Sequence, residues 1–417
     1  MIALVYTVTL LPALIAIVPI KIKPEKVDEK KEKRMDTFLL FFVNTSTRFP
    51  KHIIAIALML FIISVFYITQ LRFSQNLIDF FPDDMPVKTD LLFVDDKLKG
   101  TITAEVVIDT EKENGIHDPE ILNRIETFTN EAEKIQRPEI YVGKVFSIVD
   151  VLKETNKALH DNDPAYYTIP QDKMVVAQEL LLFENSGSDD LEKLVDSQFS
   201  KTRITIKTPW VDSVIYDKFV KEIEVMAQRT FGNKANTYTS GLSALMGRTI
   251  PMALESMAES YIIAFFVITF MMILLLGYVK LGLLSMIPNV IPIVIVMGLI
   301  RFVGQPLNLN TLFIGSIAIG LVVDDTIHFM YNFRRYYDVT HNAYEAIKET
   351  LLGTGRALLI TSLVLSASFL SLILGTLKST SSFGYYTAIT IILALLADFL
   401  VAPALMVLYV GSKNERK

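Results

Sequence analysis

The 417-residue chain contains no cysteine and only five histidines, which are scattered along it. Without thiols it can form neither a disulfide nor a cysteine-ligated metal site, and the histidine spacing fits no metal-binding motif. The glycine-bearing stretch at residues 298–304 lacks the Lys-Ser/Thr ending of a phosphate-binding loop. Hydrolytic motifs are also missing. We therefore expect a protein that is not an enzyme and that needs no metal or organic cofactor.

Charged residues are scarce as well, at 20% of the chain, whereas 51% of the residues are hydrophobic and the mean hydropathy is +0.41. Several apolar runs are long enough to cross a bilayer. We expect a polytopic α-helical membrane protein of about seven spans with a large extracytoplasmic α+β domain. Between residues 73 and 255 there are about a dozen more acidic than basic residues, and the remainder is net basic. That distribution fits basic cytosolic loops around a bundle and does not suit a nucleic-acid partner.

Hydropathy and charge divide the chain into six parts. They are a span at 1–20, a basic cytosolic linker at 21–51, a span at 52–72, an extracytoplasmic domain at 73–257, a five-helix membrane domain at 258–411 and a cytosolic tail at 412–417. The five spans are expected near 261–278, 281–303, 309–331, 357–376 and 384–410. An amphipathic helix on the cytosolic face is expected at 341–352.

The domain at 73–257 mixes two patterns. Alternation predicts strands at 101–109 and 202–207, and helical periodicity predicts helices at 118–136, 146–160 and 212–230. Two strand-plus-helix units split near 185–190 suggest two α+β lobes. The stretch at 251–260 is expected to run as a helix directly into the following span. Six residues could line a lipid groove or could simply be core: Phe80, Phe81, Tyr166, Tyr167, Met174 and Trp210.

Two adjacent carboxylates interrupt the span that contains Gly315-Ser-Ile-Ala-Ile-Gly-Leu-Val-Val-Asp-Asp-Thr-Ile-His328. A charge at bilayer depth is costly and is therefore a functional candidate. At helical spacing Ser316, Gly320, Asp324 and His328 share one face. The small residues on that face predict that a neighbouring helix packs closely there and meets the acid.

Reversible protonation is the chemistry that this pair suggests, because burial and a neighbouring carboxylate both disfavour the charged form. Asp324 is the stronger candidate of the two, since it lies on the small-residue face, and Asp325 is its partner. His328 could pass protons or could be an interfacial side chain. Asp398, Ser362 and Ser366 are possible relay partners, but each could instead be structural.

The frame Gly320-Leu-Val-Val-Asp-Asp-Thr-Ile, followed by Asn-Phe-Arg-Arg335, resembles the proton-relay helix of the resistance–nodulation–division (RND) exporters. Within that superfamily it looks most like the branch of the MmpL lipid exporters, hopanoid exporters and Patched-like proteins. MmpL proteins usually have Tyr where this chain has Asp325. The resemblance implies a porter-like external domain, a sterol-sensing-like arrangement of the five later spans, and transport driven by the proton gradient.

The helix at 7–14 repeats the pattern at 398–405, each with Pro-Ala-Leu near a membrane exit. By the resemblance, residues 1–20 correspond to the last span of a first repeat, and the chain to a C-terminal half; chance similarity of two Leu- and Ala-rich helices is the alternative. Such a C-terminal half would need either an N-terminal half as a partner or self-association into an oligomer.

The expected function is proton-driven export of lipids or other hydrophobic molecules across the cell (inner) membrane. A non-transporting sterol or lipid sensor and a proton-driven accessory subunit of protein secretion are the alternatives.

Overall fold

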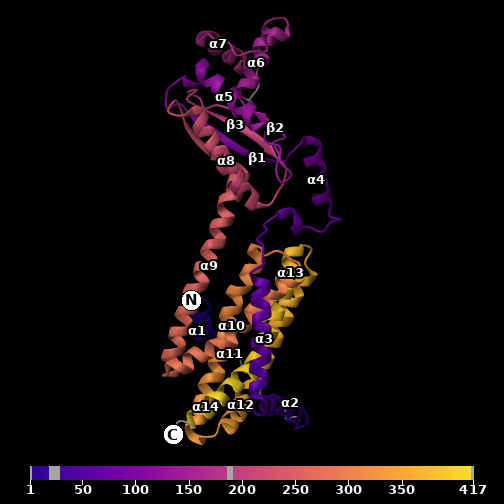
Figure 1. Ribbon diagram of the computed structural model, residues 1–417, viewed down its shortest axis with the longest axis vertical. Helices are drawn as coiled ribbons and strands as arrows, with labels where there is room; N and C mark the ends of the chain where they lie inside the picture. Colours follow the sequence, from indigo (N-terminus) through magenta and orange to yellow (C-terminus); the bar gives the residue numbers. More distant parts are fainter. Residues whose placement is uncertain (1, 18–28, 186–190, 415–417) are drawn as a thin grey trace.

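The computed structural model describes residues 2–17, 29–185 and 191–414. A bundle of long helices forms one part, and a mixed α/β domain stands beyond one end of it (Figure 1). Among the described residues, six helical segments are long and apolar enough to cross a membrane. They are α3 (Pro50–Ile68), α9 (Gly241–Leu276), α10 (Val279–Phe302), α11 (Leu309–Thr340), α12 (Ala343–Leu370) with the short η4 (Ser371–Leu374), and α13 (Lys378–Leu396) with its continuation. This confirms a polytopic helical membrane protein.

The last span changes its helical pitch midway. After α13 the chain makes a π-helical turn, η5 (Ala397–Val401), and resumes as α14 (Ala402–Asn414). Asp398 lies in this turn. Single π-turns inside α-helices are often found at functional sites because they redirect one side chain without ending the helix.

The seventh span expected at residues 1–20 is described only as α1 (Ile2–Ile17). Its 16 residues fall short of the roughly 20 that an upright helix needs to cross the hydrocarbon region. Residues 18–20 lie outside the described part of the chain. A seventh span therefore stays a prediction.

Most of the predicted linker is a helix, α2 (Glu29–Arg48). Its second half buries Leu39, Phe42 and Val43 in the core of the bundle. Asp36 accepts a hydrogen bond from Arg356 Nη2 on α12 at 2.6 Å, so a charged pair also fixes the helix. Phe and Leu at helical spacing after the lysines explain why this segment packs instead of remaining a tether.

The α/β domain is built on one four-stranded antiparallel sheet in the order β2-β3-β1-β4. The strands are β1 (Ile102–Asp109), β2 (Lys144–Phe146), β3 (Lys201–Thr208) and β4 (Asn236–Ser240). Alternate residues of β1 and β3 are buried, with Val106 opposite Ile204 in the register. The predicted helices appear as α5 (Pro119–Ala132), α6 (Ile148–Leu159) and α8 (Ser213–Phe231), joined by α4 (Pro86–Leu98) and α7 (Lys173–Glu184).

The prediction of two lobes is wrong. The two strands expected to belong to separate lobes, β1 and β3, pair along their whole length. The helices after each strand contribute to a single hydrophobic core, from Ile102 to Ala244. Each unit alone offers one long strand, which cannot bury its apolar face until the other strand joins it.

The domain and the bundle are joined by helix α9 and by contacts of the segment that follows α3. Helix α9 runs for 36 residues, about 54 Å, along one side of the bundle and up to the domain, as expected (Figure 1). Gln75 makes the second connection, since its backbone oxygen accepts from Ser213 of α8 and its Oε1 accepts from the backbone N–H of Leu309 at the start of α11. Nearby, hydrogen bonds from Lys88 and from Lys378 of α13 lower the pKa of Asp83 to about 2.

At the opposite end of the bundle, α9 ends at Gly277, which has a positive φ of 67°. The Arg334 guanidinium of α11 donates to the carbonyl of Leu276, one of the groups left unpaired at a helix end. Further along, a Cβ at Gly282 would lie 2.8 Å from the Ile273 backbone. That glycine therefore permits the close crossing of α9 and α10. The predicted amphipathic helix at 341–352 is the beginning of α12 and continues into the span.

Candidate functional site

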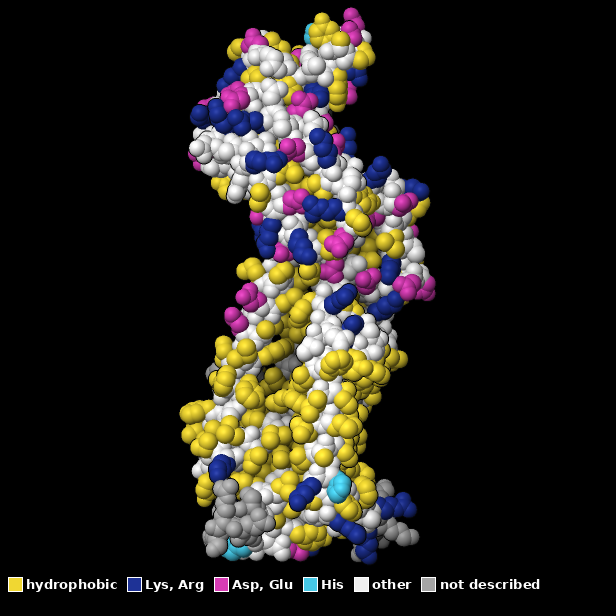
Figure 2. Space-filling view, viewed as in Figure 1, with side chains coloured by type: hydrophobic (Ala, Val, Ile, Leu, Met, Phe, Trp, Pro, Cys, Tyr) yellow, Lys and Arg dark blue, Asp and Glu magenta, His cyan; other side chains and the backbone are white. Residues whose placement is uncertain are grey.

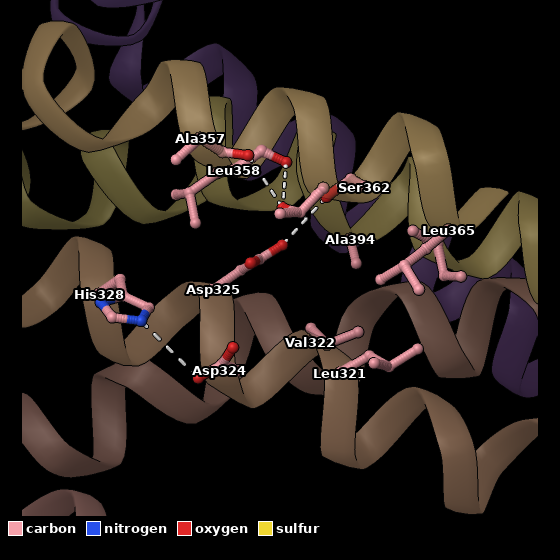
Figure 3. A pocket seen from close by; sticks show the side chains of 12 residues that line it. Leu321, Val322, Asp324, Asp325, His328, Ala357, Leu358, Ser362, Leu365 and Ala394 are labelled. Atoms are coloured by element: carbon pink, nitrogen blue, oxygen red, sulfur yellow. Dashed lines mark hydrogen bonds and ion pairs between the residues drawn. The ribbon is translucent and has the colours of Figure 1, made fainter. Parts of the chain in front are cut away.

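A cavity of about 270 Å³ lies where α11 and α12 face each other (Figure 3). Its apolar walls come from residues such as Leu321, Leu358 and Ala394. Its polar groups include the Asp pair, His328 and Ser362. The predicted acids, His328 and Ser362 therefore border a single cavity among α11, α12 and α13.

Asp325 points across this cavity toward α12, and Ser362 Oγ donates to its Oδ2 at 3.1 Å. Asp325 is half-buried, and no lysine or arginine in the described ranges pairs with it. One neutral hydroxyl replaces only part of the hydration that a carboxylate has in water. The site therefore suits a carboxyl group that carries a proton during part of its working cycle.

Asp324 also borders this cavity, but it points away from Ser362 and α12 (Figure 3). Its side chain is 72% exposed, and His328 Nε2 lies 3.8 Å from its Oδ1. That distance is too long for a hydrogen bond but allows an ion pair when the histidine is protonated. The two adjacent carboxyls thus face different surroundings, because neighbouring residues on a helix are about 100° apart.

The predicted close packing at Ser316 and Gly320 is wrong within this chain. Both residues are exposed, and a Cβ added at Gly320 would meet no atom within 4 Å. The buried face of α11 carries Ala318, Val322 and Phe329 instead. The spacing correctly places Ser316, Gly320, Asp324 and His328 on one face, but periodicity alone does not say which face the same chain covers.

Asp398 is fully buried and belongs to a separate polar group. Its Oδ1 lies 2.6 Å from Thr326 Oγ1, and the same hydroxyl lies 2.6 Å from Asn289 Oδ1 of α10. Asp398 therefore contacts α11 through Thr326 and forms no hydrogen bond with Asp325. Ser366 is buried too, and its hydroxyl has no hydrogen-bond partner among the described residues.

Sequence reasoning missed Thr326 and Asn289. Thr326 follows the Asp pair directly, and Asn289 is an amide inside an apolar span between Pro288 and Pro292. Mid-span polar residues are unusual, and that signal could have identified both.

Two apolar cavities of about 470 and 430 Å³ lie on the other side of α11, between α3, α9 and α10. They share Phe265, Met286 and Val290, so they adjoin and form one groove. We call the two together the apolar groove. Asn289 lines it as one of few polar residues. Figure 2 shows hydrophobic side chains over this part of the molecule and a hollow beside α9.

In the α/β domain a cavity of about 720 Å³ is lined by Tyr167 together with Lys144, Glu154 and Phe183. Of the six predicted groove residues, Tyr167 is the one that lines it. Trp210 packs against the domain core, and its backbone N–H donates to Asp95. On α7, which contributes Phe183 to this cavity, burial raises the pKa of Glu179. No cluster of three His, Asp or Glu side chains within the described ranges could hold a metal ion.

The fold and these buried acids define a polytopic membrane protein with ionisable groups between its spans. The chain belongs to the MMPL family, whose profile matches residues 132–417, a range that includes the Asp pair, Ser362 and Asp398. Members of that family are membrane transporters, and the match confirms the resemblance to RND-type proteins. A protein of Methanocaldococcus jannaschii named only as a membrane protein, MJ1562, is 22% identical over 340 residues, which are 78% of this chain and 82% of the relative.

Proposed function

We propose that this protein is a proton-driven exporter of lipids or other hydrophobic or amphiphilic molecules, in which Asp324 and Asp325 carry the proton. The observation that supports it best is the Asp325 carboxyl, held by Ser362 in a cavity between two spans. A carboxyl at this depth without a cation beside it serves no obvious structural purpose. Its charge is costly there and is removed each time a proton binds.

Proton binding would change the contact between α11 and α12, because the neutral acid needs less solvation than the carboxylate. Helix α11 begins at Leu309, whose N–H is bonded to Gln75. Gln75 also bonds to α8 of the α/β domain. A shift of α11 would therefore reach the domain through Gln75.

The apolar groove supports a hydrophobic substrate. Its volume is in the range of ligand cavities, and its walls are almost entirely hydrocarbon. A lipid sensor would use the same groove without moving protons, whereas an accessory subunit of secretion would use protons without the groove. A transport measurement separates the three.

The orientation follows from the basic residues. Arg334, Arg335 and Lys348 lie in or near the turn between α11 and α12, at the end of the bundle away from the α/β domain. The positive-inside rule puts that end in the cytosol. We therefore propose a multi-pass protein of the cell (inner) membrane with its α/β domain on the periplasmic or extracellular side.

The exposed face of Ser316, Gly320, Asp324 and His328 supports an oligomer. Within a span, an exposed carboxyl would face hydrocarbon and cost several kcal/mol. A second copy of this chain, or an N-terminal half, would cover that face and enclose Asp324 as Asp325 is enclosed now. The small residues there allow a helix to approach closely.

The test is transport by the purified chain in proteoliposomes with a fluorescent phospholipid and an imposed proton gradient. We expect movement of the lipid that stops when a protonophore collapses the gradient. Binding of the lipid without movement would favour the sensor, and neither binding nor movement would contradict an exporter of lipids.

A further inference from the structure

Asp398 is the most enclosed acid in the described chain. Its side chain is 0% exposed, and its Oδ2 has no hydrogen-bond partner. An ionised carboxylate in that position would lack nearly all of its solvation, at a cost of many kcal/mol. Native proteins seldom leave such a charge uncompensated.

No compensating cation is present among the described residues around it. The η5 turn packs against α2, α3, α10, α11, α13 and α14. Asp325 of α11 directly precedes Thr326, which bonds Asp398, and it is an acid as well. The nearest polar group from α10 is the neutral Asn289, reached through Thr326.

A count of hydrogens indicates the protonation state. Thr326 Oγ1 lies 2.6 Å from both Asn289 Oδ1 and Asp398 Oδ1, and each distance requires a hydrogen between the oxygens. The threonine hydroxyl supplies one hydrogen only. The orientation of the Asn289 amide is set by its Nδ2, which donates to the Ser285 carbonyl at 3.1 Å, so its Oδ1 must accept. The second hydrogen must come from Asp398.

We propose that Asp398 is a second, exchangeable proton site, distinct from the Asp324–Asp325 pair. In the described structure it is a carboxylic acid that donates to Thr326, which donates to Asn289. Loss of the proton would turn the Thr326 hydroxyl toward the new carboxylate. Asn289 Oδ1 would then lose its donor.

The hydrogen-bonded series Asp398–Thr326–Asn289 connects the proton site to the apolar groove, which Asn289 lines. Once Asp398 is deprotonated, the free Asn289 oxygen can accept a hydrogen bond from a molecule in the groove. An amphiphile with a hydroxyl or amine group would satisfy it, whereas a pure hydrocarbon would not. By thermodynamic linkage, such an amphiphile and the proton on Asp398 disfavour each other.

Infrared spectroscopy of the purified protein tests the site directly, through the C=O band of a protonated carboxyl. We expect a band that shifts in D₂O, falls reversibly as the pH is raised, is lost in Asp398→Asn and persists in Asp325→Asn. A spectrum in which Asp398→Asn removes no such band would overturn the proposal. A band that does not respond to pH while the protein stays folded would also overturn it.

Thr326 provides variants for the case in which Asp398→Asn does not fold. Thr326→Ser keeps the hydroxyl and should keep the band in place, whereas Thr326→Val should shift it to higher frequency. Equal spectra for the two would contradict the hydrogen-bond chain. For the link to the groove, dodecanol should weaken the band at a fixed pH and dodecane should not; equal effects would refute that link. None of these spectroscopic measurements depends on transport, so their outcome is independent of whether the proposed function holds.

Discussion

Asp325 of α11 and Ser362 of α12 face each other across a cavity, with 3.1 Å between Oδ2 and Oγ, while Asp324 points to the exposed side of the same helix. One carboxyl is thus partly enclosed between two helices of this chain, and its neighbour is exposed. Because Asp325 and Asp324 have different surroundings, different substitutions should affect each carboxyl.

Removal of the Ser362 hydroxyl should slow transport. Among the described residues, Ser362 supplies the one side-chain hydrogen bond to the Asp325 carboxyl, and a bond to a charged group contributes about 1.5–3 kcal/mol. We expect Ser362→Ala to lower the transport rate about tenfold, which corresponds to ~1.4 kcal/mol. Ser362→Thr should stay near wild type. Ser366→Ala is the matched control, since Ser366 lies on the same helix without contact to Asp325. Equal rates for the two alanine variants would show that the hydroxyl plays no part.

Gln75 should couple the α/β domain to α11. Gln75→Ala leaves the Leu309 N–H without its acceptor, at a cost of about 1–3 kcal/mol if water does not replace it. We expect faster amide hydrogen exchange at the start of α11 and slower transport, with the domain itself still folded. Gln70→Ala, at an exposed position after α3, should change neither. Unchanged exchange at Leu309 in Gln75→Ala would contradict the coupling.

Cysteine crosslinking tests whether a second copy covers the exposed face of α11. Gly320→Cys fits without strain, because a Cβ there meets no atom within 4 Å. Since the chain has no native cysteine, each variant carries a single thiol. We expect Ser316→Cys and Gly320→Cys to form disulfide-linked dimers in membranes, and Phe270→Cys on the exposed side of α9 not to. Absence of dimers at all three positions would leave an N-terminal half as the partner of that face.

The orientation of the protein in the membrane can be checked with other single-cysteine variants of this cysteine-free chain. An impermeant thiol reagent should label Asn130→Cys on α5 in intact cells, and should label Val339→Cys only after the membrane is opened. Both positions are exposed, so a difference between them reports the side of the membrane. The reverse pattern would invert the proposed topology.

The spans, the main strands and the amphipathic helices of the domain could be predicted because each is a local pattern. Hydropathy locates α10 and α13, and alternation locates β1. The single sheet could not be predicted in this way, because the pairing of Val106 with Ile204 joins residues far apart in sequence. The same limit applies to the site. Helical spacing groups Asp324 with Ser316, but which face is buried depends on the neighbours of α11.

Asp398 illustrates the limit most clearly. The sequence shows an acid in a span, which fits a structural role as well as a relay role and does not decide between them. Its significance comes from Thr326 and Asn289, which reach it from two other helices, and from the π-turn that carries it. These relationships exist only once the helices are packed.

The central claim is that Asp324 and Asp325 carry the proton as a pair, and a double-mutant cycle in proteoliposomes tests it most directly. Asparagine keeps the shape of aspartate but cannot bind and release the proton. We predict that Asp324→Asn and Asp325→Asn each lower proton-driven transport by about a hundredfold or more, and that the double variant is no slower than the worse single one, because the groups act as a unit. Helix content and thermal stability should survive in all three. Full proton-coupled transport by a well-folded Asp324→Asn, Asp325→Asn double variant would contradict the account.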